Sequence, residues 1–406
     1  MRIAYISPYP PEKEGVGDYL ALLLAELREA GNDIEVTVFA QPDSTVPQDE
    51  FVMSGTIVRR TWKPNSLTAL LRLRDELQSG DFDLVHLEYG HYSKYGGFAG
   101  ETLLIPFLGL AKRHPILVTL HSLWFPDLLK LRLSERCPGR PWLTSLAGWL
   151  FNTYFSFFCR LFKRVVLLTN VATPTISKRV SNSFGLSPDK LVVWVHPSPT
   201  PKSFPLSPIP RERVPASVPF RVVCPGFISA RKGIETAIDA IEGQTISRRF
   251  ELTIVGECLR RADVEYLERL KKQYRESIRL GRLKFKTDPV DSSALELAAQ
   301  SADAVVLTHS YRVGPSGLVA RLASVGVPLI ATSDPNFLPG PTTSPFILVP
   351  PRDRIALGRE LESLATEPDR VDRLSTQLRE WATTNSYAAH ARNHLKLYTE
   401  LVRESA

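Results

Sequence analysis

The chain has few cysteines, and none of them is spaced like a metal ligand. Four occur among 406 residues, Cys137, Cys159, Cys224 and Cys258, with no CxxC pair. A disulfide framework or a zinc site would need a more regular spacing, so we expect buried thiols in a reducing compartment. The histidines and carboxylates form no cluster with ligand spacing either, so we expect no metal.

Long apolar runs are also lacking. None is long and clean enough to span a bilayer, and the N-terminal MRIAYISPYPP has no signal-peptide core. We therefore expect a cytoplasmic protein. Residues 141–168 are unusual, because they are rich in aromatics and end in Arg160, Lys163 and Arg164. The second half predicts an internal helix that leads into a buried strand. Residues 142–158 leave open an aromatic and basic element that contacts a membrane surface peripherally, at its inner face.

The positive charge is moderate and scattered. Fifty Lys and Arg against 43 Asp and Glu give a net charge of +7. This balance suits an acidic small molecule, nucleic acid or an anionic membrane surface. Because the basic residues form no single run, we expect no nucleic-acid partner. The hydrophobic fraction of 43% and charged fraction of 23% are typical of a soluble enzyme, with material for two cores.

Strands and helices are expected to alternate in two series, separated by a proline-rich segment, PSPTPKSFPLSPIPRERVPASVP. Its proline density excludes helix and strand and indicates a linker. We predict a Rossmann-like domain at 1–197, the linker at 198–219, a second such domain at 220–387 and a final helix at 388–406. The expected strands are 2–7, 34–39, 56–60, 84–87, 116–120, 165–168, 191–196, 220–224, 251–255, 283–286, 304–308, 327–331 and 346–349. The expected helices include 19–31, 66–77, 172–184, 234–241, 262–278, 292–299, 318–325, 355–365 and 368–381.

The most informative stretch is 304–332, AVVLTHSYRVGPSGLVARLASVGVPLIAT. Its pattern predicts a buried strand, a glycine-containing loop, a helix that ends at Gly326, and another strand. Ligands bind at the carboxyl ends of strands in open α/β sheets, and the free N–H groups of a helix start favour phosphate. A plain βα connection has the same shape, so the pattern alone does not decide.

The same stretch resembles the donor-binding segment of the retaining glycosyltransferases of family 4, E-G-x-G-x-x-x-x-E-A-x-A-x-G-x-P. Aligned on Gly326 and Pro328, the chain keeps Gly314, Leu318 and Ala323. The resemblance implies the GT-B fold: two Rossmann-like domains that face each other across a cleft, with the last helix crossing back to the N-terminal domain. It implies metal-independent transfer of a sugar, with retention, from a nucleotide-diphosphate sugar to a glycan, lipid or other acceptor, as in polysaccharide biosynthesis. It implies no separate cofactor.

The resemblance also assigns residues in the first half. Gly15 and Gly17 resemble the G-x-G turn whose amides face the donor diphosphate. His121, in VTLHS, matches a family histidine near the donor sugar, and we predict a catalytic role for it. The pair of LEYG and TLHS is similar to a bacterial and archaeal subgroup, which places Glu88 and Tyr89 on the acceptor side.

In the second half the motif is kept only in part. The loop GFISARKG resembles G-R-x-x-x-x-K-G, so Lys232 is the predicted catalytic lysine that clamps the diphosphate, with Arg231 beside it. Phe227 stands where the family has arginine. The two family glutamates fall on Val313 and Arg321, which cannot accept the same hydrogen bonds. The remaining donor contacts that we predict are Gly314, Ser316, Gly317, Leu318 and Arg321.

Two further hypotheses stay open. One is a catalytically degenerate GT-B scaffold that binds a glycan or a partner protein. The other is a sugar-nucleotide 2-epimerase, which needs a carboxylate base, and Glu88 is the attractive candidate. The run Asp81-Phe82-Asp83 matches the metal-binding DxD of another glycosyltransferase fold. Because it precedes a strand, we interpret it as a solvated turn.

Overall fold

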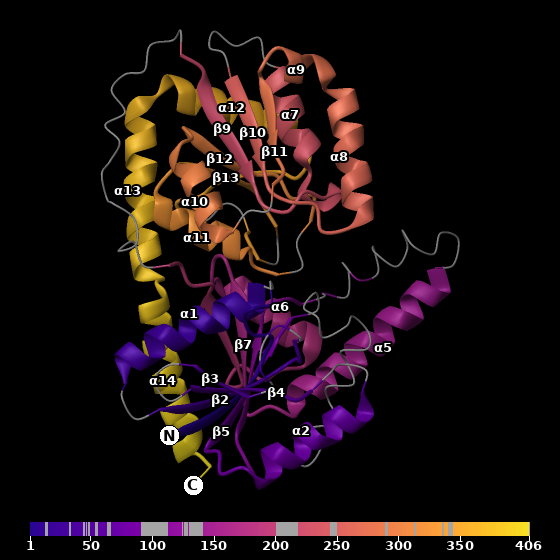
Figure 1. Cartoon of the computed structure of the whole chain (residues 1–406), viewed down its shortest axis with the longest axis vertical. Helices are drawn as coiled ribbons and strands as arrows, with labels where there is room; N and C mark the ends of the chain where they lie inside the picture. Colours follow the sequence, from indigo (N-terminus) through magenta and orange to yellow (C-terminus); the bar gives the residue numbers. More distant parts are fainter. Residues whose placement is uncertain are drawn as a thin grey trace. The chain divides into compact units, whose positions relative to one another are not determined.

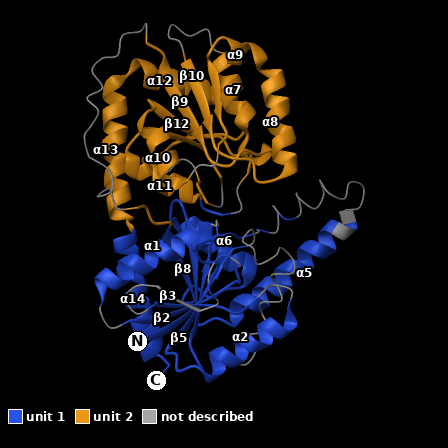
Figure 2. Ribbon diagram, viewed as in Figure 1, with its two compact units in different colours: residues 1–195, 313–315, 387–406 blue, residues 196–312, 316–386 orange. Residues whose placement is uncertain are grey.

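The computed structural model forms two compact α/β units. Unit 1 comprises Met1–Val195, Val313–Pro315 and Tyr387–Ala406, and unit 2 comprises His196–Arg312 and Ser316–Ser386 (Figure 2). The structure describes residues 1–12, 15–31, 34–43, 45, 47, 49–52, 56–62, 66–90, 113–123, 125, 129, 141–199, 218–243, 250–288, 291–311, 314–334, 337–339 and 344–405. Most of the predicted linker, residues 200–217, lies outside these. Each unit is considered by itself.

The described part of unit 1 is built on an eight-stranded sheet, in the order β3-β4-β2-β1-β5-β6-β7-β8. Its strands are β1 Arg2–Ile6, β2 Glu35–Ala40, β3 Asp49–Val52, β4 Thr56–Arg60, β5 Leu84–Tyr89, β6 Ile116–Leu120, β7 Arg164–Thr169 and β8 Leu191–Val195. Every pairing is parallel except that of β3 with β4. The edge strand β3 is one that the sequence did not predict. Nearly every residue of β1, β5 and β6 is buried, which fits a parallel sheet covered on both faces.

The described helices of unit 1 are α1 Gly15–Ala30, α2 Leu67–Ser79, α5 Pro141–Arg160, α6 Pro174–Phe184 and α14 Tyr387–Arg403, and two of them, α2 and α6, begin at capping residues. The hydroxyl oxygens of Ser66 and Thr173 accept hydrogen bonds from the third residues of α2 and α6, as capping residues do. Gly185, with φ of 62°, ends α6 in the left-handed region that favours glycine.

The last helix, α14, belongs to unit 1, as the resemblance implies. It packs against α1 (Figure 1). Tyr387, Ala391, Leu397, Tyr398 and Leu401 join one core cluster with the buried leucines of α1 and the central strands. The first unit is therefore completed by residues that follow unit 2 in the sequence.

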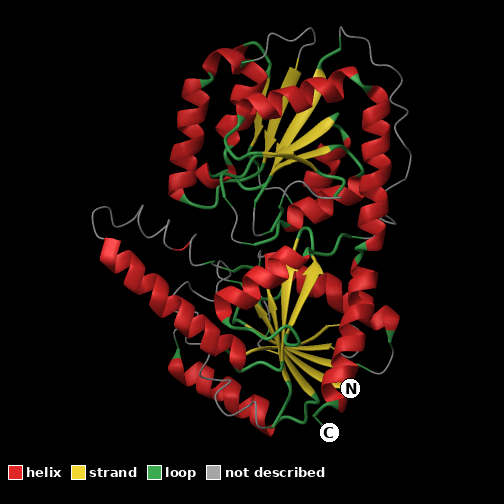
Figure 3. Cartoon of the chain, turned by 180° about the vertical axis from the view of Figure 1, so that it is seen from behind, coloured by secondary structure: helices red, strands yellow, loops and turns green. Residues whose placement is uncertain are grey.

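Unit 2 has a six-stranded, all-parallel sheet within its described residues, in the order β11-β10-β9-β12-β13-β14, with helices on both faces (Figure 3). Its strands are β9 Phe220–Pro225, β10 Phe250–Val255, β11 Leu283–Lys286, β12 Ala304–Leu307, β13 Leu329–Thr332 and β14 Ile347–Val349. Its helices are α7 Ile234–Glu242, α8 Arg261–Gln273, α9 Arg275–Arg279, α10 Ser292–Gln300, α11 Gly317–Val325, α12 Arg354–Thr366 and α13 Pro368–Thr384, with the 3-10 turn η4 Ala230–Lys232. The predicted strands and helices are found with small shifts of their ends.

Three local predictions need correction. The helix α1 begins at Gly15, so Gly15 and Gly17 lie in its first turn and not in a turn before it. Strand β5 extends to Tyr89, so Glu88 belongs to a buried strand and not to the loop that follows it. The single helix expected at 262–278 is interrupted at Tyr274, which is the C-cap of α8.

The packing of α14 predicts the cost of shortening one of its side chains. Leu401 is fully buried, so Leu401→Ala should lower the free energy of unfolding by about 2–5 kcal/mol. The measurement is urea denaturation followed by tryptophan fluorescence, with Leu297→Ala, an exposed leucine on α10, as the matched control. An unchanged midpoint in Leu401→Ala would show that α14 adds nothing to the core.

Candidate functional site

In unit 2 the loop after β9 contains two glycines with positive φ, which strains any other residue. Gly233 has φ of 61°, and a β-carbon there would lie 2.2 Å from the backbone oxygen of Thr308. Gly226 has φ of 113° and faces the side chains of Leu318 and Lys232. The close approach of these backbones brings the ends of β9 and β12 together with the start of α11.

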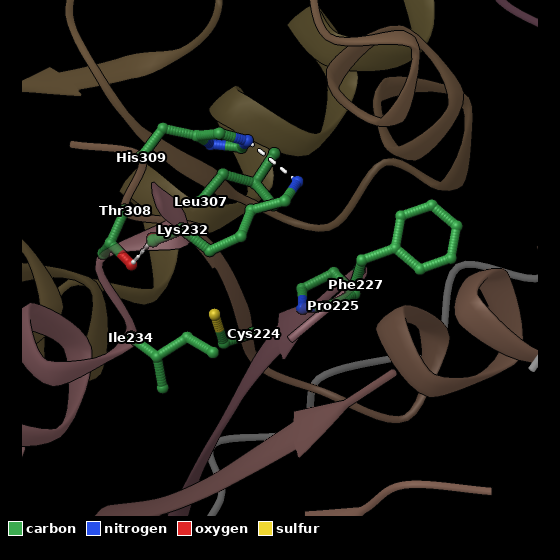
Figure 4. Close-up of a pocket in the computed structure, with 9 residues that line it drawn as sticks. Cys224, Pro225, Phe227, Lys232, Ile234, Leu307, Thr308 and His309 are labelled. Atoms are coloured by element: carbon green, nitrogen blue, oxygen red, sulfur yellow. Dashed lines mark hydrogen bonds between the residues drawn. The ribbon is translucent and has the colours of Figure 1, made fainter. Parts of the chain in front are cut away.

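The centre of this region is a pair formed by Lys232 and His309. The Lys232 ammonium donates to Nε2 of His309 over 2.8 Å (Figure 4). A protonated lysine has only donors, so Nε2 is the acceptor and the imidazole is neutral, with its hydrogen on Nδ1. Both backbones are fixed: Thr308 Oγ1 donates to the oxygen of Lys232 over 3.1 Å, and Thr332 Oγ1 donates to that of His309 over 2.7 Å.

A small pocket opens beside this pair. Figure 4 shows its lining, Cys224, Pro225, Gly226, Phe227, Lys232, Ile234, Leu307, Thr308 and His309. Burial raises the pKa of the Cys224 thiol to about 11, so this cysteine is a neutral wall and not a nucleophile. Phe227, in the position of the family arginine, is half-exposed and adds no charge. The pocket therefore joins apolar walls to a cation and a neutral imidazole.

The start of α11 supplies backbone donors on the same side of unit 2. Ser316 is its N-cap, and its hydroxyl accepts from the N–H of Val319. A β-carbon on Gly317 would lie 3.3 Å from the ring of His196, and the Leu318 side chain lies against Gly226. The structure thus brings Ser316, Gly317 and Leu318 to the loop that carries Lys232.

Arg321 and Arg231 are engaged in the structure of unit 2 itself. The Arg321 guanidinium donates to the buried carboxylate of Glu296, on α10, over 2.8 Å. Arg321 is thus neither a solvated charge nor an uncommitted donor. The backbone oxygen of Arg231 accepts from the N–H of Ser310 over 2.9 Å, so this residue fastens the two loops together. Arg312 and Val313 lie outside the described residues.

Unit 1 contains a second candidate site, the buried pair of Glu88 and His121. The two residues come from neighbouring strands, because Glu88 is opposite Thr119 in the register of β5 with β6. His121 Nε2 lies 2.7 Å from Glu88 Oε2. Burial raises the pKa of Glu88 well above its usual value and lowers the pKa of His121 to about 3. Burial thus disfavours the charged form of both groups. In the neutral pair the Glu88 hydroxyl donates to His121 Nε2, and the single imidazole hydrogen lies on Nδ1.

A hydrogen-bonded chain connects this pair to α14. His86 Nε2 lies 2.8 Å from Thr119 Oγ1 and 3.5 Å from Glu88 Oε1, while His86 Nδ1 lies 2.8 Å from the hydroxyl of Tyr398. That hydroxyl is also hydrogen-bonded to Tyr5. The last helix therefore fixes the neighbours of Glu88 through polar contacts as well as through its apolar side chains.

Aromatic side chains enclose the other side of His121. The Tyr19 ring meets His121 edge-on, with ring centroids 4.5 Å apart, and its hydroxyl lies 2.6 Å from His390 Nε2. Trp194 packs edge-on against His390 and His394. The sequence analysis missed His86, His390 and His394. Spacing could have indicated them: His86 and Glu88 share one face of a strand, and His390 and His394 share one face of a helix.

The other residues predicted in unit 1 are mainly structural. Tyr89 is buried, with its ring centroid 5.2 Å from that of Phe158, and its contact with an acceptor stays a prediction. A β-carbon on Gly17 would lie 3.3 Å from the carbonyl of Pro8, while Gly15 has open space beside it. A β-carbon on Gly314, which unit 1 includes, would lie 2.3 Å from the oxygen of His121.

The structure offers no metal-binding cluster of three or more ligands among its described residues. Asp81 pairs with Arg2, and Asp83 accepts from the backbone N–H of Arg2 over 2.7 Å, so both carboxylates fasten the start of β1. Cys159 and Cys224 are buried thiols as predicted, and Cys258 is half-buried.

The two α/β units, each built on a mainly parallel sheet, have the architecture of the GT-B fold, and comparison with known proteins agrees. Residues 14–197 match the model of Glycosyltransferase Family 4. This match covers somewhat less than half of the chain and is consistent with a divergent relative of that family. No curated protein matches the sequence.

Solved structures match over nearly the whole chain. Sucrose-phosphate synthase from Thermosynechococcus elongatus is 18% identical, with a TM-score of 0.73 and full coverage of both chains. A glycosyltransferase from Rickettsia africae is 14% identical, with a TM-score of 0.71, covering 99% of this chain and 98% of that one. Anabaena HepE, in complex with UDP and glucose, is 14% identical, with a TM-score of 0.65, covering 98% and 99%. At these identities the likeness establishes the fold.

The buried imidazoles of unit 1 predict a loss of stability in mild acid. Burial lowers the pKa of His394 to about 4 and lowers that of His86 and His121 as well. As the pH falls below about 6.5, the unfolded chain binds protons that the folded chain rejects, and each imidazole contributes a loss of up to about 1.4 kcal/mol per pH unit. The raised pKa of Glu88 acts in the opposite sense above about 4.5, but three imidazoles outweigh it.

The variant His394→Phe tests this, because it removes one titrating group and keeps an aromatic ring. Denaturation at a series of pH values between neutral and mildly acid should give a shallower loss of stability than in the parent. His114→Gln, which removes a histidine outside this network, serves as the control. An identical pH dependence in parent and His394→Phe would contradict the prediction.

Proposed function

We propose that the protein is a retaining glycosyltransferase that moves a sugar, of hexose type, from a nucleotide-diphosphate sugar to a glycan or lipid acceptor without a metal. The observation that carries the proposal is the Lys232–His309 pair at the ends of β9 and β12, beside the start of α11. Transfer of the sugar leaves a nucleoside diphosphate on which negative charge builds up. A positioned cation and free backbone N–H groups stabilise that charge more in the transition state than in the ground state.

In this mechanism Lys232 binds the diphosphate, and His309 holds the lysine ammonium in position. The neutral imidazole accepts one hydrogen of the ammonium and leaves the others for phosphate oxygens. The N–H groups of Gly317 and Leu318, with the hydroxyl of Ser316, add donors at the positive end of α11. This set replaces the arginine lost at Phe227. In this proposal the donor contacts of the chain are rebuilt and not simply missing.

His121 is suited to orient a sugar and not to carry charge. Because Nε2 accepts from Glu88, the hydrogen on Nδ1 can be donated to a hydroxyl of the donor sugar. Glu88 holds this tautomer. Its full burial and raised pKa argue against the epimerase hypothesis, which needs an accessible, ionised base.

The donor is best tested first with UDP, because HepE, one of the structures similar to this chain, is solved with it. In isothermal titration calorimetry Lys232→Ala should bind UDP about 10- to 100-fold more weakly than the parent, as expected for a lost hydrogen bond from a charged group. The melting temperature should barely change. Lys271→Ala, a lysine paired with Glu268 on the surface of α8, is the matched control. Equal affinities for parent and Lys232→Ala would show that Lys232 does not contribute to UDP binding.

The same titration separates the transferase from the degenerate scaffold. A parent protein that binds none of UDP, GDP, ADP and their sugars would support the scaffold, because its donor pocket would have no ligand. Binding of one nucleotide, with hydrolysis of its sugar conjugate, would support the transferase. His309→Ala should weaken binding less than Lys232→Ala, since it leaves the charge in place.

Metal independence gives a separate prediction. With cationic groups in place of a metal, turnover of a nucleotide sugar should be unchanged within about twofold after treatment with EDTA, since no metal contributes to the barrier. The measurement is release of the nucleoside diphosphate. Complete loss on chelation, restored by magnesium or manganese, would overturn the prediction and return attention to Asp81 and Asp83.

A further inference from the structure

Helix α5 carries an apolar face that unit 1 does not bury. Its large exposed side chains are Trp142, Leu146, Trp149, Leu150 and Phe157, with exposed fractions from 46% to 65%. Their spacing of four, three, one and seven residues places all of them on one side of the helix. The opposite side, with Phe151, Phe155 and Phe158, is buried in unit 1. The helix is thus apolar on two faces, and only one of them has a partner within the described residues.

The charge along α5 is one-sided. From Pro141 to Arg160 the sequence contains no acidic residue, and Arg160 is the one charged side chain. Arg160 follows Trp142 by eighteen residues, which is five helical turns, so it continues the exposed face. Lys190 Nζ donates to the backbone oxygen of Arg160 and brings a second cation to this end. Lys163 and Arg164 follow, both paired with Glu404.

The exposed apolar face of α5 and its basic end together fit a lipid surface better than a second copy of the chain. If two copies of the chain paired through this face, Arg160 of one copy would lie against Arg160 or against apolar side chains of the other. Neither helix has a carboxylate that could neutralise this charge. Tryptophan is suited to a membrane interface, where its ring is apolar and its N–H remains hydrated. No helix in the described part of the chain is long and apolar enough to cross a membrane. A helix of this length, about 30 Å, would instead lie along the surface.

We propose that the exposed face of α5 is a docking surface for membranes that contain anionic phospholipid. The tryptophans, leucines and Phe157 enter the headgroup boundary, and Arg160 and Lys190 contact the lipid phosphates. Binding increases with buried apolar area and with the negative charge of the bilayer. The inference stands on α5 alone and does not depend on the donor or on catalysis.

The test uses the full-length protein and sedimentation with large vesicles. One set contains phosphatidylcholine only, and the other contains equal parts of phosphatidylcholine and phosphatidylglycerol. The parent should bind the second set more strongly, with a blue shift of tryptophan fluorescence as Trp142 and Trp149 leave water. The double variant Trp142→Ser/Trp149→Ser should bind at least about tenfold more weakly. Arg160→Glu should reduce binding to the anionic vesicles selectively.

The matched control is Leu259→Ser/Leu297→Ser, which removes two equally exposed leucines from unit 2 and should leave vesicle binding unchanged. Melting curves check that the variants fold, as expected for substitutions of exposed side chains. Equal binding by the parent and the tryptophan variant would overturn the proposal, as would failure of the parent to bind anionic vesicles. A parent dimer in sedimentation velocity that the tryptophan substitutions dissociate, without vesicle binding, would assign the face to self-association instead.

Discussion

A carboxylic acid without access to water is the strongest constraint on unit 1. Glu88 is fully buried, and an isolated carboxylate there would be far less stable than in water. Its hydrogen-bond partners must therefore come from the protein. The residue after β6 supplies His121, β5 supplies His86, and α14 supplies Tyr398, so the polar atoms of this network belong to elements far apart in the sequence. A half-satisfied network of this kind would cost more than an apolar core, which is why the packing of α1 and α14 around it is so complete.

The candidate site of unit 2 depends on a charged side chain, in contrast to the buried neutral pair of unit 1. Lys232 keeps its charge at the edge of a pocket, and a neutral histidine holds it there. In the mechanism proposed above, the cost of losing the family arginine at Phe227 is limited, because one oriented cation and a helix start can provide much of the stabilisation of a leaving diphosphate. That mechanism separates two tasks: a neutral pair orients the sugar through hydrogen bonds, and a charged group responds to developing negative charge.

Much of this arrangement could be predicted from the sequence, because it depends on local patterns. Short β-branched runs, glycines and prolines located nearly every strand and helix, and the fold class followed from their alternation. The β3 edge strand and the break at Tyr274 were missed, since pairing and packing with distant residues decide both. The resemblance to family 4 directed attention to Lys232 and His121, whose roles stay predictions. It did not indicate His309, nor the pairing of Arg321 with Glu296, which is 25 residues earlier in the chain. It also gave no sign that Tyr89 packs against Phe158 of α5.

The membership of α14 in unit 1 has a consequence for how the chain is made. Unit 2 is continuous apart from one short loop, whereas the core of unit 1 contains residues from before and after it. A ribosome therefore releases every strand of unit 2 before it releases the helix that covers α1 and His86. Until then the apolar surface of α1 and the imidazole of His86 face solvent or a chaperone. The unit that begins first in the sequence can be completed only after the other has been synthesised, so its exposure to aggregation lasts for nearly the whole time of translation.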